Sequence, residues 1–174
     1  MKNNKQRIGA EELDFEVVDL YKSESNKSAT SVLHFDTEDN NQFCDFTEAV
    51  LEIVSKSNIK HGSVTLFTPH TTTAVVINES ETGYINDFKK KIEELVPSDS
   101  YYEHDDWDLR TENMQEDENV NGRSHVRGTI IGSTGVTLPI INSELIIGRW
   151  QRLFFVELDC ARSRRLFVQT QDLN

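Results

Sequence analysis

The sequence has few of the residues that cross-link or break a chain: two cysteines, three prolines and eight glycines among 174 residues. Cys44 and Cys160 are too few for a disulfide scaffold or a cysteine-rich zinc site. We therefore expect buried thiols in a reducing compartment, by default the cytoplasm. No apolar run approaches the roughly 20 residues of a membrane span, and residues 1–7 have no apolar segment behind them that would make a secretory signal. We expect no membrane partner.

Positive charge is also scarce. Lys and Arg total 18 against 30 Asp and Glu, which gives a formal net charge of −12. This balance opposes non-specific binding to nucleic acid or to an anionic membrane surface, so we expect no nucleic-acid partner. An anionic small molecule would need a local positive pocket, because the field of the whole chain repels it.

Hydrophobic periodicity predicts one α+β domain built on antiparallel sheets, with two main helices. We expect a polar tail over 1–12 and the single domain over 13–174. Apolar residues recur at helical spacing over about 45–57 and 83–96, which predicts the helices. Clusters of β-branched and aromatic residues between turn residues predict strands over 15–21, 29–35, 63–67, 74–77, 126–132, 136–141, 144–148, 150–158 and 165–169.

Residues 98–124 are long, polar and without periodicity. Irregular segments of this length inside a domain are either functional or disordered. Disordered segments are poor in aromatic residues, whereas this one contains Tyr101, Tyr102 and Trp107. The sequence therefore predicts a functional loop.

Polar groups surround the predicted strand 74–77. His70 follows a proline before the strand, and Asn78 and Glu79 come directly after it. A hydrophobic core has no use for these groups, whereas a binding site does. We take the stretch as a candidate site.

Three of the five histidines lie in polar contexts at predicted strand ends or in the long loop: His70, His104 and His125. A divalent transition metal can take three imidazoles and keep an open position for water. The spacing matches no short zinc motif, so each histidine is also compatible with a local structural role. His34 and His61 are assigned to that structural role.

A cation, an indole and an amide follow one another at the start of the predicted strand 150–158: Arg149 directly before it, then Trp150 and Gln151. The strand ends in the carboxylates Glu157 and Asp159, and residues 162–165 contain three arginines. The fork of an arginine suits phosphate or carboxylate. The alternatives are an exposed edge that pairs with the acidic surface, and a buried Glu157 paired with an arginine of a neighbouring strand or subunit.

The motifs in chain order are Thr68-Pro-His-Thr-Thr, Asn78-Glu79, Tyr102-Glu-His-Asp-Asp, Asn121-x-x-x-His125, Pro139-Ile-Ile-Asn, Leu145-Ile-Ile-Gly-Arg-Trp-Gln and Glu157-Leu-Asp-x-x-Arg162. Together they resemble the YjbQ-like family, whose members are often described as secondary thiamine-phosphate synthases. The resemblance covers about residues 15–171. Asn142-Ser143 replaces the usual Asn/Asp-Gly turn, and Asp159-Cys160-Ala161-Arg162 replaces Asp-Gly-Pro-Arg.

The resemblance implies a β-sandwich-like α+β core, a homotrimer, and a polar site often associated with a metal. The implied activity joins an aminopyrimidine diphosphate to a thiazole phosphate and releases pyrophosphate. Carried onto this chain, the motif histidines are His70, His104 and His125. The other matching positions are Asn78, Glu79, Asp106, Asn121, Trp150, Gln151 and Arg162.

Two functional hypotheses follow. In the first, an enzyme acts on a phosphorylated small molecule that a divalent metal, zinc or magnesium, helps to hold. Arg162 or Arg149 would clamp the anion, and Glu79 or a histidine would move a proton, with Asp106 as a further catalytic candidate. In the second, the same residues form a non-catalytic site for a metal or an anionic metabolite. A third, weaker reading is that the histidines and arginines hold subunits together.

Overall fold

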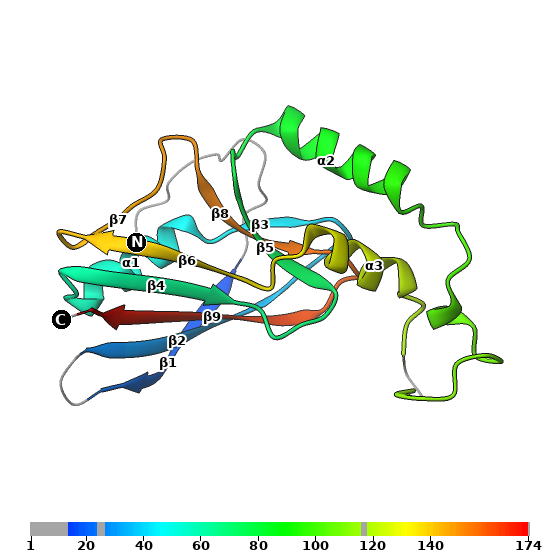
Figure 1. Cartoon of the computed structure of the whole chain (residues 1–174), viewed down its shortest axis with the longest axis horizontal. Coiled ribbons are helices and arrows are strands. Elements are labelled where there is room, and N and C mark those ends of the chain that lie inside the picture. Colours follow the sequence, from blue (N-terminus) through cyan, green and yellow to red (C-terminus); the bar gives the residue numbers. More distant parts are fainter. Residues whose placement is uncertain (1–13, 24–26, 116–117, 174) are drawn as a thin grey trace.

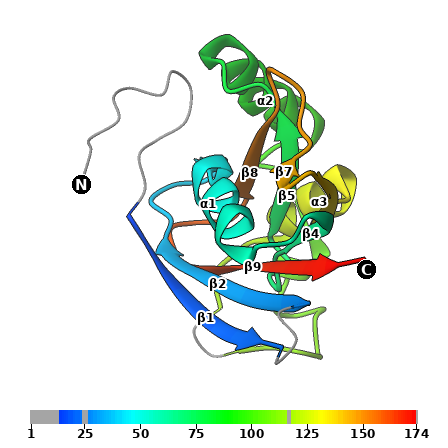
Figure 2. The same cartoon turned by 90° about the vertical axis from the view of Figure 1, so that its left-hand side faces the viewer.

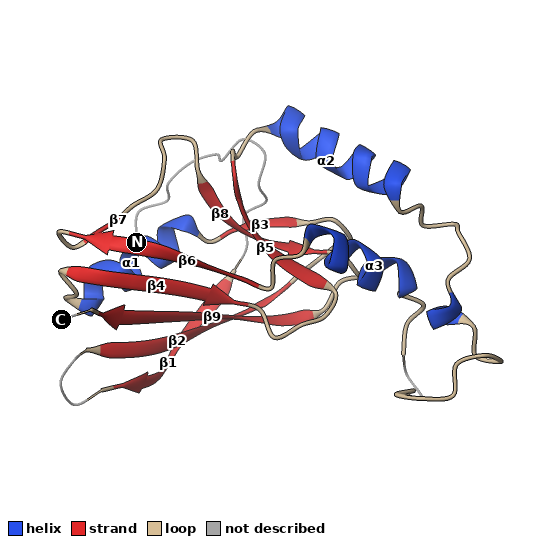
Figure 3. Cartoon of the chain, in the orientation of Figure 1, coloured by secondary structure: helices blue, strands red, loops and turns tan. Residues whose placement is uncertain are grey.

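Two antiparallel sheets form the frame of the protein (Figures 1 and 3). The computed structural model describes residues 14–23, 27–115 and 118–173, so the tail predicted over 1–12 lies outside the described residues. The larger sheet has six strands, in spatial order β1 (Phe15–Lys22), β2 (Ser28–Asp36), β9 (Ser163–Asp172), β4 (His61–Phe67), β6 (Gly135–Ile141) and β7 (Glu144–Leu145). The smaller sheet has three, in the order β3 (Phe43–Asp45), β8 (Arg152–Glu157) and β5 (Thr73–Asn78).

Strand β8 separates two hydrophobic clusters. Successive side chains of a strand point to opposite faces, and the four at the centre of β8 alternate between the clusters. Leu153 and Phe155 pack with the six-stranded sheet, while Phe154 and Val156 pack on the opposite side. All four are fully buried. The predicted β-sandwich-like core is confirmed.

Two helices cover these clusters. Helix α1 (Thr47–Ser57) packs on the inner face of the six-stranded sheet through Val50 and Val54 (Figure 2). Helix α2 (Thr82–Leu95) covers the back of the smaller sheet through Ile85. The carboxylate of Glu81 accepts the N–H groups of Gly83 and Tyr84, which caps the start of α2. Both predicted helices are confirmed.

The strand predicted over 126–132 is wrong, because these residues lie in a third helix, α3 (Gly122–Ile131). The β-branched residues of this segment favour a strand, but tertiary contacts of its polar side chains stabilise the helix instead. The fully buried guanidinium of Arg127 donates to Glu93 and to the carbonyl of Val96. Gly132, with φ 73°, ends the helix in the left-handed conformation.

Some predicted boundaries change as well. The strand expected over 144–148 is limited to β7, and the strand expected from 150 begins only at Arg152. Asn142 and Ser143 form the turn before β7 with φ 54° and 65°, so two non-glycine residues adopt the positive φ that such turns need. None of the helices in the described ranges is long and apolar enough to cross a membrane.

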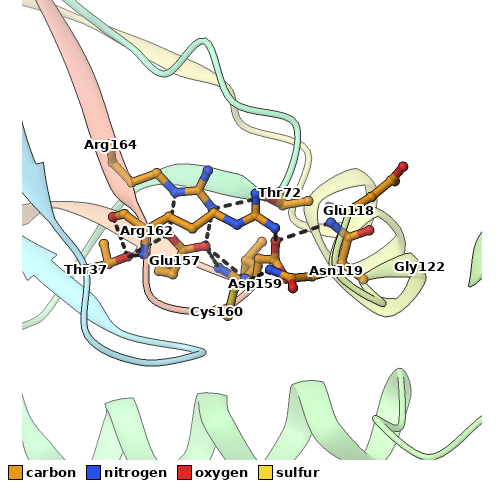
Figure 4. Close-up of polar contacts among 12 residues, drawn as sticks. Thr37, Thr72, Glu118, Asn119, Gly122, Glu157, Asp159, Cys160, Arg162 and Arg164 are labelled. Carbon is orange, nitrogen blue, oxygen red and sulfur yellow. Dashed lines mark hydrogen bonds and ion pairs between the residues drawn. The ribbon is translucent and has the colours of Figure 1, made fainter. Parts of the chain in front are cut away.

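A buried ion pair ties the end of β8 to the start of β9 (Figure 4). The guanidinium of Arg164 grips both carboxylate oxygens of Glu157, with Nη2 2.6 Å from Oε1. Thr37 donates its hydroxyl to Oε2 at 3.0 Å, and the N–H groups of Leu158 and Asp159 donate to Oε1. Glu157 is therefore buried against a neighbouring strand, as one reading of the sequence proposed, and Arg164 is not on an exposed edge.

We predict that Arg164→Ala lowers the free energy of unfolding by about 3–5 kcal/mol, because it leaves the Glu157 carboxylate buried without its cation. Arg165→Ala is the matched control, since Arg165 is exposed. It should change the free energy by less than about 0.5 kcal/mol. Urea denaturation measures both, and equal losses in the two variants would contradict this role of the pair.

Candidate functional site

Two histidines from the long loop and from α3 lie side by side. The ring centroids of His104 and His125 are 4.5 Å apart at 55°. His104 belongs to the short 3-10 turn η1 (Glu103–Asp105), and the carboxylate of Asp105 accepts the N–H groups of Asn121 and Gly122 at 2.9 and 2.8 Å. These two bonds fix the turn to the start of α3 and so bring the two imidazoles together.

Gly122 makes this close approach possible. A Cβ atom at position 122 would lie 2.6 Å from Cβ of Tyr102 and 2.9 Å from Oδ2 of Asp105. No side chain larger than hydrogen fits there without moving the loop. The glycine in the Asn121-x-x-x-His125 motif therefore has a packing reason.

A chain of polar contacts surrounds His104. Its Nε2 lies 3.1 Å from Oδ1 of Asn121 and 3.3 Å from Oε1 of Glu118. Nη1 of Arg110 donates to Oε1 of Glu118 at 2.7 Å and to the carbonyl of His104 at 3.2 Å. Both Arg110 and Glu118 are mostly buried, so this ion pair holds the loop around His104.

The same network reaches the turn between β8 and β9. Asn121 donates through Nδ2 to Oδ2 of Asp159 at 3.2 Å. Nη2 of Arg162 lies 2.9 Å from the same oxygen (Figure 4). Nε of Arg162 is buried and has no acceptor among the described residues. A buried guanidinium N–H without an acceptor is uncommon in folded proteins.

Burial lowers the pKa of His125 below its ordinary value of 6.5, and the nearby His104 lowers it further. The hydrogen bond from Arg110 lowers the pKa of Glu118. At neutral pH the site thus holds a neutral His125 imidazole and an ionised Glu118. A neutral imidazole is the form that accepts a proton or binds a metal.

His70 has a different partner, the first residues of β9. Its Nε2 accepts the backbone N–H of Arg165 at 3.1 Å, which requires that nitrogen to be unprotonated. Burial lowers the pKa of His70 to about 4, and the charges of Arg164 and Arg165 add to the effect. The structure connects His70 to β9 through this bond.

The remaining predicted residues are divided among three places, of which one, the loop before α3, holds Asp106. Asn121 and Arg162 join the histidine pair. Asn78 pairs with Arg152 at one end of the β5–β8 ladder, while Thr73 pairs with Glu157 at the other, roughly 16 Å away along the strand. Four more candidates lie at or beyond the Asn78 end: Glu79, Arg149, Trp150 and Gln151.

These distant candidates make local contacts. Glu79 is exposed, and its backbone N–H donates to the side chain of Asn78 at 2.8 Å. Arg149 lies over the Trp150 ring at 4.7 Å, and Oε1 of Gln151 accepts the N–H of Gly148 at 2.7 Å. Within one chain they do not complete the histidine site.

Sequence reasoning missed Arg110 and Glu118. The available signal was charge: Arg110 is the only arginine or lysine between residues 98 and 120. A lone cation in such an acidic stretch has carboxylates to pair with. Cys160, expected to be buried, is only partly buried, and its sulfur lies 3.3 Å from Nδ2 of Asn119.

Among the described residues, no group of three or more His, Cys, Asp or Glu is placed to hold a metal ion. His104 and His125 supply two neighbouring imidazoles. Imidazole donors suit zinc, whereas magnesium prefers oxygen ligands. The residues present therefore fit part of a zinc site, and they fit a magnesium site poorly.

The family follows from sequence comparison. The chain belongs to the YjbQ-like UPF0047 family, whose model matches residues 31–172. A UPF0047 protein of Archaeoglobus fulgidus is 36% identical over 128 residues, which cover 74% of this chain and 90% of that protein. The YugU protein of Bacillus subtilis is 24% identical over 79% of this chain and 95% of its own length.

Solved structures agree with the fold. A YbjQ-like protein of unknown function from Sulfolobus solfataricus superposes with a TM-score of 0.68 at 30% identity, over 83% of this chain and 99% of that one. A hypothetical protein from Aeropyrum pernix gives a TM-score of 0.70 at 30% identity, over 82% and 98%. The sequence resemblance to this family is confirmed.

His70 provides a prediction about pH. Because its folded-state pKa of about 4 lies below the ordinary value of 6.5, neutral His70 contributes stability that is complete above about pH 6.5 and is lost as the pH falls toward 4. An NMR titration of the imidazole should show its inflection near 4. In urea denaturation, His70→Gln, which retains an acceptor, should lose less stability than wild type between pH 6.5 and 4. An inflection near 6.5 would contradict the partly buried, neutral state of His70.

Proposed function

We propose that this protein is an enzyme that binds a phosphorylated small molecule beside the His104–His125 pair. The observation that carries the proposal is the buried Nε of Arg162, which has no acceptor among the described residues. Arg162 contacts the carboxylate of Asp159, and the same carboxylate accepts a hydrogen bond from Asn121 in the network of the histidine pair. A phosphate oxygen would satisfy the Nε donor and use the fork of the guanidinium. In a chain of net charge −12, such a local donor is what would capture an anion.

The reaction we propose is that of the secondary thiamine-phosphate synthases. The nitrogen of a thiazole phosphate donates its electron pair to the methylene carbon of an aminopyrimidine diphosphate. The carbon–oxygen bond to the diphosphate breaks, and pyrophosphate leaves with that bond's electrons. Arg110 and Arg162 would offset the negative charge that develops on the leaving group. Neutral His125 would hydrogen-bond the diphosphate.

We propose that a divalent metal takes part, held by His104 and His125. When bound, it would neutralise charge on the diphosphate oxygens. Of the two metals considered, the imidazole donors favour zinc over magnesium. His70 would be a ligand only through Nδ1, because its Nε2 accepts the Arg165 N–H.

The test is turnover. Purified protein is incubated with both substrates and zinc, and released pyrophosphate and the product mass are measured. We expect kcat/KM to fall by about a hundredfold or more in His125→Ala. Arg162→Lys, which keeps the charge and loses the fork, should cost about tenfold. His34→Ala, an exposed histidine on β2, should match wild type.

A non-catalytic binding protein is the second candidate. The observation that favours it is the position of Glu79, one of the candidates for proton transfer, at the opposite end of β5 from Glu157 and Asp159. A binding protein would saturate with the aminopyrimidine diphosphate and yield no product at any protein concentration. That result would replace the enzyme proposal.

We further propose a homotrimer assembled through the outer face of the six-stranded sheet, which none of the described helices covers (Figure 2). An apolar row crosses this face from strand to strand: Val18, Val32, Phe167 and Phe67 are successive cross-strand partners. Phe67 leaves 46% of its surface exposed. An apolar row of this kind suits a subunit contact.

Light scattering should give three times the 20.0 kDa mass of the chain. Phe67→Lys should reduce that mass, because it places a charge in the apolar row. Leu95→Lys, at an exposed position of α2, should leave it unchanged. A wild-type monomer or dimer would rule the trimer out.

We also infer that the protein works in the cytoplasm, since Cys44 and Cys160 are both free thiols. Subcellular fractionation tests this location, and recovery outside the cytoplasmic fraction would contradict it.

A further inference from the structure

A cavity lies in the loop between α2 and α3, and the proposed reaction does not use it. Its volume is about 430 Å³. Three aromatic and three acidic residues supply most of its lining: Tyr101, Tyr102, Trp107, Asp105, Asp106 and Asp108. Figure 1 shows this loop at one end of the molecule, beyond the sheets.

Hydrogen bonds fix the two tyrosines, while Tyr101 and Trp107 remain exposed. Tyr101 donates its hydroxyl to Oδ2 of Asp106 at 2.7 Å, and Tyr102 donates its hydroxyl to the carbonyl of Pro97 at 2.6 Å. Tyr101 and Trp107 nevertheless expose 68% and 47% of their surface. Aromatic rings that are already fixed and exposed can contact a ligand with little loss of side-chain entropy.

The charge of the cavity has one sign. Among the described residues that line it there is no lysine, arginine or histidine. The carboxylate of Asp106 accepts the Tyr101 hydroxyl and the N–H groups of Asp108 and Leu109, so its two oxygens are fixed at the edge of the cavity. Asp105 uses Oδ1 for two backbone N–H groups, which leaves Oδ2 for other contacts.

Aromatic walls with carboxylates are the chemistry that recognises an organic cation. The faces of Trp and Tyr attract ammonium and methylated ammonium groups, and carboxylates add Coulombic attraction. A bare metal ion fits less well, because no described cluster here is placed to hold one and the aromatic rings offer no ligand atoms. An anion is repelled.

We infer that the cavity lined by Tyr101, Tyr102, Trp107 and the three aspartates binds an organic cation with an apolar body, of the quaternary ammonium class. The group can come from a free small molecule or from a methylated lysine side chain. This inference does not rest on the proposed transferase activity, because it concerns a separate cavity and the opposite ligand charge.

Choline is the probe. The chain has two tryptophans, Trp107 and Trp150, so the Trp150→Phe variant carries Trp107 as its only indole reporter. Choline should change the Trp107 fluorescence saturably. The neutral isostere 3,3-dimethylbutan-1-ol, of the same shape, should bind at least about tenfold more weakly.

Variants in the same background locate the site. Asp106→Asn should weaken choline binding by about tenfold, and Tyr101→Phe, which releases Asp106, should weaken it by a smaller factor. Glu144→Gln removes the same charge from an exposed position on β7 and should leave choline affinity unchanged. Circular dichroism checks that each variant is folded.

The outcomes separate the possibilities. Equal affinity for choline and its neutral isostere would mean an apolar pocket only and would overturn the inference, as would the absence of saturable binding. Equal weakening by Asp106→Asn and Glu144→Gln would reduce the effect to overall charge and also overturn it. Tighter binding of a trimethyllysine peptide than of choline would identify a protein as the source of the cation.

Discussion

The ion pair between Glu157 and Arg164 is the interaction on which the site depends. It joins the last residue of β8 to the start of β9, and each side chain is almost completely buried. A charge in that position stays ionised only while its partner is present. Because the Glu157 carboxylate also accepts the N–H groups of Leu158 and Asp159, the pair fixes the backbone that presents Asp159 and Arg162.

The loop between α2 and α3 is attached to this fixed turn. Asn121 links His104 to Asp159, and Asp105 ties η1 to the start of α3. Each contact alone is modest, but the network gives two neighbouring imidazoles and an arginine donor a defined geometry. The loop between α2 and α3 thus contributes both to the histidine and arginine network and to the cavity of aromatic rings and aspartates.

Much of the fold could be predicted because alternation is a local property. Strands β4 and β6 and both amphipathic helices follow from the spacing of apolar residues. Helix α3 could not be found this way, since the Arg127 contacts and the Asp105 cap that stabilise it come from distant segments. The family resemblance assigned His104 and His125 to one site, and their rings lie 4.5 Å apart. The bond of His70 to β9, and the roles of Arg110 and Glu118, depend on three-dimensional contacts that no spacing rule encodes.

The most direct test of the account is the metal content of the purified protein, because the account places two zinc-binding imidazoles at His104 and His125. We expect nearly one zinc per chain in wild type and in His34→Ala, and loss of the metal in His104→Ala and in His125→Ala. No metal in wild type, even after reconstitution with zinc, would contradict the metal site. Retention of zinc in both site variants would contradict its assignment to this pair.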